Sequence, residues 1–86
     1  MAKYDIKINE GNAGLCAKVP YNGRVYFADL CSLIFLGTTE CMIFDITKEG
    51  QLCLSNANEL YCKRGIPVTE DSLTACIDEF LASLAE

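Results

Sequence analysis

The sequence predicts an α+β fold: an antiparallel sheet of about five short strands, joined as hairpins or a meander and packed by one C-terminal amphipathic helix. Three features predict it. Short segments with alternating apolar and polar residues fill most of the chain, turn sequences with glycine or asparagine separate them, and the residues after 68 carry apolar side chains at helical spacing. The 86 residues leave room for one domain, spanning 1–86.

Two strands are expected near the N-terminus. Residues 3–9 alternate between apolar and polar side chains, which is typical of a half-buried strand. Its apolar positions are Tyr4, Ile6 and Ile8. Residues 10–14 contain glycines that tolerate positive φ, so we expect a turn there. Residues 15–19 alternate again and predict the second strand.

The pair Asn22-Gly23 gives the strongest local signal in the sequence. Between two apolar segments, this pair favours a tight type I′ turn, because both of its residues adopt positive φ readily. Residues 24–28 are therefore expected to return as the third strand, with Val25 and Phe27 on its apolar face.

Residues 29–37 leave two alternatives open. Leu30, Leu33 and Ile34 lie at helical spacing. The stretch also begins with an aspartate that could cap a first turn and ends with a glycine that could close the last one. These features favour a short helix, and the alternative is one more buried strand.

The next part of the chain predicts a hairpin and a short strand. Residues 41–46 alternate, with Met42, Phe44 and Ile46 as one apolar face. After a turn at 47–50, residues 51–55 are expected to return as the hairpin partner, and residues 59–63 to form a short final strand.

A C-terminal helix is predicted after residue 68. The Thr69 hydroxyl can accept a hydrogen bond from a free N–H of the first turn, and Glu70 and Asp71 complement the positive end of the helix dipole. An apolar stripe follows, formed by Leu73, Ile77, Phe80, Leu81 and Leu84, with Cys76 beside it. This stripe is expected to pack on the sheet.

Charge and hydropathy restrict the partners. Twelve carboxylates against seven Lys and Arg give a net charge of −5, so a basic face for nucleic acid or anionic membranes is not expected. No apolar segment approaches the ~18 residues of a membrane span. The charged, alternating N-terminus lacks the pattern of a signal peptide, which predicts a cytoplasmic protein.

The sequence has six cysteines and no histidine. Without an export signal, reduced cysteines that act as small core residues are favoured over a disulfide framework. Cys16 and Cys41 are placed opposite the apolar faces of their strands, where they would be exposed if those faces meet water. No Cys-x-x-Cys pair favours zinc, and Cys31 would be a candidate nucleophile only if a helix began at Asp29. We therefore expect no enzyme and no cofactor.

A non-catalytic protein-binding module is the function that these features favour. Its partner would be a protein, for example one with a basic surface. One specific hypothesis is an anti-CRISPR-like inhibitor from a phage or mobile element that imitates nucleic acid. The candidate binding residues are Tyr21, Tyr26, Glu40, Asp45, Glu49, Glu59, Glu70, Asp71, Asp78 and Glu79. The alternatives are a structural homo-oligomer, for example a homodimer through sheet edges or faces, and a thiol or metal module.

Overall fold

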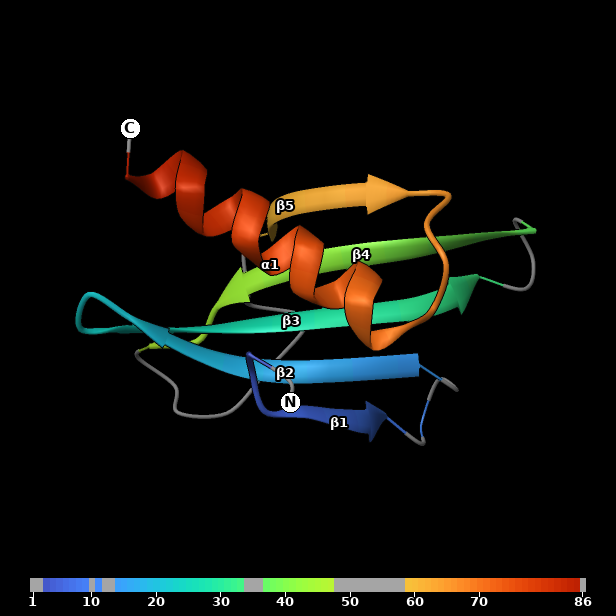
Figure 1. Cartoon of the computed structure of the whole chain (residues 1–86), viewed down its shortest axis with the longest axis horizontal. Coiled ribbons are helices and arrows are strands. Elements are labelled where there is room, and N and C mark those ends of the chain that lie inside the picture. Colours follow the sequence, from blue (N-terminus) through green and yellow to red (C-terminus); the bar gives the residue numbers. More distant parts are fainter. Residues whose placement is uncertain (1–2, 10, 12–13, 34–36, 48–58, 86) are drawn as a thin grey trace.

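The fold is a five-stranded antiparallel sheet covered on one face by one helix (Figure 1). The computed structural model describes residues 3–9, 11, 14–33, 37–47 and 59–85. The elements follow in the order β1 (Ile6–Asn9), β2 (Gly14–Tyr21), β3 (Arg24–Leu33), β4 (Thr38–Asp45), β5 (Glu59–Arg64) and α1 (Glu70–Leu84).

The sheet is a meander in which every strand pairs antiparallel with the next along the chain. This confirms the predicted fold class. Helix α1 lies diagonally across one face of the sheet (Figure 1). The described helix is not long or apolar enough to cross a bilayer.

Strand register decides which side chains α1 covers. Ala17, Ala28, Ile43 and Tyr61 lie side by side across β2 to β5 on the covered face. The buried residues of α1 that pack against this face are Leu73, Cys76, Ile77 and Phe80. Neighbouring residues along a strand point to opposite faces of the sheet. The row next to this one therefore lies on the uncovered face, and its residues are Cys16, Asp29, Met42 and Cys62.

The turn between β2 and β3 confirms the prediction at Asn22-Gly23. Tyr21 pairs with Arg24, and the two residues between them have φ values of 50° and 78°. Positive φ at both central residues is what a type I′ turn requires, and its twist matches that of the flanking strands.

The predicted short helix at 29–37 is wrong. β3 continues as a strand to Leu33, residues 34–36 lie outside the described part, and Gly37 has φ 64° at the turn before β4. Leu30 points under α1 and Cys31 points to the opposite face, yet both are buried. A strand buried on both faces has an uninterrupted apolar sequence, and part of such a sequence can match helical spacing by chance.

The prediction of which side chains of β4 face the core is also wrong: it chose Met42, Phe44 and Ile46. Ile43 and Cys41 face α1, and Cys41 has no exposed surface, so it is a core residue and not an exposed thiol. β4 pairs with β3 along one edge and with β5 along the other. The expected hairpin partner at 51–55 lies outside the described residues. Both faces of β4 carry apolar residues, so alternation alone did not identify the covered face.

Candidate protein-binding surface

Helix α1 carries the largest group of exposed carboxylates among the described residues. The Thr69 side chain accepts a hydrogen bond from Ser72 N at 3.1 Å, which caps the helix as predicted. Glu70 and Asp71 occupy the first turn, are exposed and form no ion pair with a described residue. They complement the positive end of the helix dipole.

Asp78 lies on the side of α1 that faces the N-terminal segment. Its carboxylate accepts hydrogen bonds from the Tyr4 hydroxyl at 2.5 Å and from Lys3 Nζ at 3.1 Å. These bonds hold the pKa of Asp78 below its usual value. Burial and the bonded carboxylate together raise the pKa of Tyr4 to about 12. Asp78 is therefore a fixed, ionised group at neutral pH.

Glu79 lies on the other side of α1, over β5. It accepts a hydrogen bond from the Tyr61 hydroxyl at 3.2 Å and pairs with Lys63 Nζ at 3.4 Å. Burial, a hydrogen bond with Cys76 and the Glu79 carboxylate raise the pKa of Tyr61, so this phenol stays protonated. One lysine thus flanks each side of the helix, and neither lysine was among the predicted site residues.

The other predicted carboxylates are scattered. Asp45 pairs with Arg24 at 2.6 Å near the β2–β3 turn, and hydrogen bonds from Thr47 together with Arg24 lower its pKa. Glu59 is exposed at the start of β5. Glu49 lies outside the described residues.

Two predicted site residues do not reach the surface. Tyr26 is only 6% exposed, because it lies under α1 with its ring 5.1 Å from that of Phe80 in an edge-to-face arrangement. Glu40 is buried on the opposite face, where it accepts a hydrogen bond from Arg64 Nε at 2.6 Å. Tyr21 is half-buried against the core at the end of β2.

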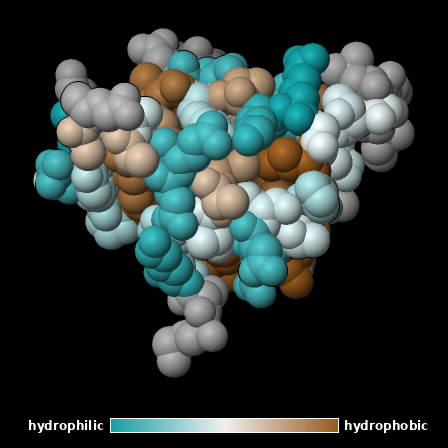
Figure 2. Space-filling view, turned by 45° about the horizontal axis from the view of Figure 1, so that its top comes forward, coloured by the Kyte–Doolittle hydropathy of each residue, from teal (hydrophilic) through white to brown (hydrophobic). Residues whose placement is uncertain are grey.

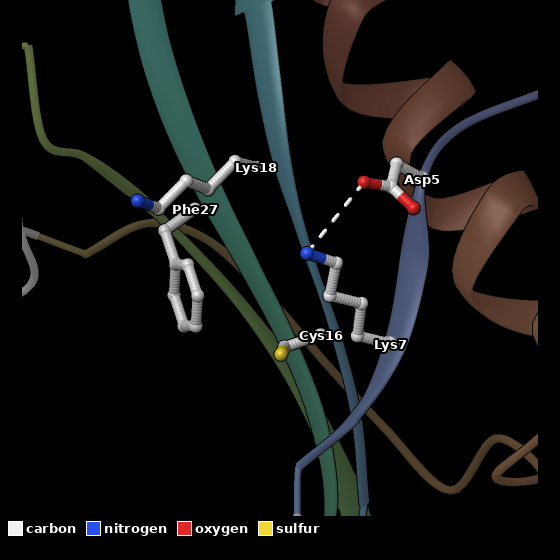
Figure 3. A pocket seen from close by; sticks show the side chains of 5 residues that line it. All are labelled: Asp5, Lys7, Cys16, Lys18 and Phe27. Carbon is white, nitrogen blue, oxygen red and sulfur yellow. Dashed lines mark ion pairs between the residues drawn. The ribbon is translucent and has the colours of Figure 1, made fainter.

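A small cavity lies on the sheet face that α1 leaves uncovered. Its volume is ≈ 190 Å³, and its lining residues are Asp5, Lys7, Cys16, Lys18 and Phe27 (Figure 3). Burial and the nearby Asp29 carboxylate raise the pKa of Cys16 more than Lys7 lowers it, so the thiol is protonated. The predicted site included none of these residues, because register across three strands brings them together.

The described cysteines are free thiols. Burial is the main factor that raises the pKa of Cys31, Cys41 and Cys62, so none of these thiols is activated as a nucleophile. In the ranges that the structure describes, no group of three or more cysteine or carboxylate side chains could hold a metal ion. Cys53 lies outside these ranges.

Comparisons with protein-family models, with curated proteins and with solved structures find no match to this chain.

Replacing Tyr4 with phenylalanine is expected to lower the free energy of unfolding by about 1 kcal/mol at neutral pH, because a partly hydrated carboxylate loses one hydrogen bond. Since the pKa of Asp78 is lowered in the folded state, the stabilisation exists while Asp78 is ionised and disappears as pH falls through that folded-state pKa. Urea unfolding of both proteins across the acidic range measures the difference. A difference that stays constant with pH would contradict this account of the Tyr4–Asp78 bond.

Proposed function

We propose that this chain is a non-catalytic protein-binding module whose binding surface is the outer side of α1. The observation that carries this proposal is the charge of the helix. Between residues 70 and 85, α1 and its C-cap contain four carboxylates and no lysine or arginine. We call Glu70, Asp71, Ala75, Asp78 and Glu79 the acidic face of α1.

The spacing of the acidic face suits contact with a second protein. Asp71, Ala75 and Glu79 follow one another at intervals of four residues, so they lie on one line that is about 12 Å long. Ala75 is exposed and small, which lets a partner backbone or a long basic side chain approach between the two carboxylates.

The contacts that Asp78 and Glu79 make within the chain support this role, and they leave acceptor positions of both carboxylates available for a partner. Each carboxylate has two oxygens with about four acceptor positions. The contacts with tyrosine and lysine fix the side chains in one geometry, and this reduces the entropy that binding would otherwise cost. An arginine-rich surface can therefore bind carboxylates that are already ordered.

The finer part of the proposal concerns the partner. A basic surface that otherwise holds nucleic acid offers Arg and Lys at high density, and a small protein of net charge −5 could occupy it as an inhibitor. An anti-CRISPR-like protein from a phage or mobile element would act in this way. Small size, acidity and the arrangement of α1 support this class of partner.

Charge reversal on α1 tests the proposal. Asp71→Lys with Glu79→Lys is expected to weaken partner binding at least about tenfold, because both carboxylates lie on the contact line. The partner is first captured from lysate with the tagged chain and identified by mass spectrometry, and its dissociation constant is then measured by calorimetry over a salt series.

A control is Asp5→Lys, a single charge reversal at an exposed carboxylate beside the cavity on the other sheet face. It should leave binding close to that of the unchanged chain. Equal affinity for all three proteins at every salt concentration would contradict the proposal, provided that circular dichroism shows each of them folded.

A further inference from the structure

The outer edge of β5 carries backbone groups that pair with no strand in the described part of the chain. Gly65 N donates to Thr39 O at 3.0 Å, which places this residue pair at a hydrogen-bonded position of the β4–β5 ladder. Bonding in an antiparallel pair alternates along the strand, so Lys63 also bonds toward β4. Cys62 and Arg64 direct their N–H and C=O groups away from β4, and no described strand pairs with them.

The end of α1 extends the apolar stripe beyond the sheet that it covers. Ile77 and Phe80 are 1% and 3% exposed, whereas Leu84, the last position of the same stripe, is 42% exposed. The C-terminal turns of α1 run out past the first residues of β5 (Figure 1). Figure 2 is turned so that the β5 side of the molecule faces the reader. In this view, hydrophobic side chains reach the surface between hydrophilic ones. An added strand beside β5 would lie under the end of the helix.

The charges along β5 indicate what this added strand is. The strand begins with Glu59 and ends with Lys63 and Arg64, and five of its six residues are exposed. If a second β5 pairs with it in the antiparallel direction, the acidic end of each strand lies beside the basic end of the other. Parallel pairing would bring like charges together, which is unfavourable in a sheet.

We propose that two copies of this chain associate through β5, antiparallel about a two-fold axis, and form one continuous sheet with the helices on the same face. The interface is isologous, so Glu59 of each copy meets the basic end of its partner and each charge contact occurs twice. The exposed Leu60 and Leu84 lose water on association. This dimer does not depend on the partner proposed for α1.

Sedimentation velocity of the full chain, from micromolar to millimolar concentration, measures the monomer–dimer equilibrium. Cys62→Pro removes an N–H that points away from β4, so it should abolish the dimer while the fold remains. Cys62→Ala keeps the N–H and should retain the dimer. This pair separates the loss of the backbone bond from the loss of the thiol.

A charge swap tests the antiparallel direction. Glu59→Lys is expected to raise the dimer dissociation constant by about tenfold, since two opposite-charge contacts become like-charge contacts. Adding Lys63→Glu to this variant should restore much of the affinity. Circular dichroism confirms that each variant is folded.

Two results would overturn the proposal. The first is an unchanged chain that stays monomeric over the whole concentration range, which would leave the β5 edge open to an extended peptide of another protein. The second is a dimer that the proline variant and the charge variants leave unchanged, which would place the contact on another surface.

Discussion

Replacing Gly14 with alanine is expected to destabilise the protein by about 3 kcal/mol or more. A Cβ at this position would lie 2.1 Å from Leu30 O and 3.0 Å from the Cα of Cys31. Both are backbone atoms of β3, so no rotation of a side chain can relieve the overlap. The start of β2 would have to move away from β3, which would disturb the adjacent pairing of Leu15 with Leu30.

Urea unfolding of the two proteins measures this effect, and Gly11→Ala is the matched control. Among the described residues, a Cβ at Gly11 would meet only Asn9 Oδ1 at 3.5 Å, which is an ordinary contact. This control should change the free energy of unfolding by less than about 0.5 kcal/mol. If both alanine variants are equally stable, the close approach of β2 and β3 at Gly14 does not exist in solution.

Replacing Phe80 with alanine is expected to cost about 3–5 kcal/mol, because the ring is almost wholly buried between α1 and the sheet. Its centroid lies 5.1 Å from that of Tyr26 and 6.1 Å from that of Tyr61, both in edge-to-face geometry. Each such pair adds about 0.5–1.5 kcal/mol beyond the burial of its area. The loss would therefore remove the main contact between the helix and the middle of the sheet.

Leu84→Ala offers a comparison on the same helix stripe. Leu84 is largely hydrated in one copy of the chain, so at dilute concentration its replacement should cost less than about 1 kcal/mol. Chemical unfolding followed by circular dichroism gives both values. Similar losses at the two positions would mean that Phe80 is not the centre of the helix–sheet contact.

The sequence was sufficient where local chemistry decides the structure. The turn at Asn22-Gly23 and the cap at Thr69 depend on residues a few positions apart, and both form as predicted. The end of β3 could not be predicted in this way. Its residues are apolar toward both faces, and only its pairing with the neighbouring strands β2 and β4 distinguishes a strand from a short helix.

The candidate site shows the same division. The sequence identified the carboxylates of α1 because the helix itself was predicted, but it gave no sign that Glu40 and Tyr26 would be buried by other elements. The lysines beside α1 come from the N-terminal segment and from β5. Their contacts with Asp78 and Glu79 depend on tertiary packing, so the positions of the acidic residues in the sequence could not predict them.

Site-specific photo-crosslinking tests most directly whether α1 is the binding surface. A photoreactive residue at Ala75, which is exposed between the carboxylates of the acidic face, is compared with the same residue at Lys18 on the opposite sheet face. The proposal predicts that the captured partner crosslinks to the protein labelled at 75, through a peptide rich in arginine or lysine, and not to the protein labelled at 18. Crosslinking at 18 alone would contradict it and would move the binding surface to the face with the cavity.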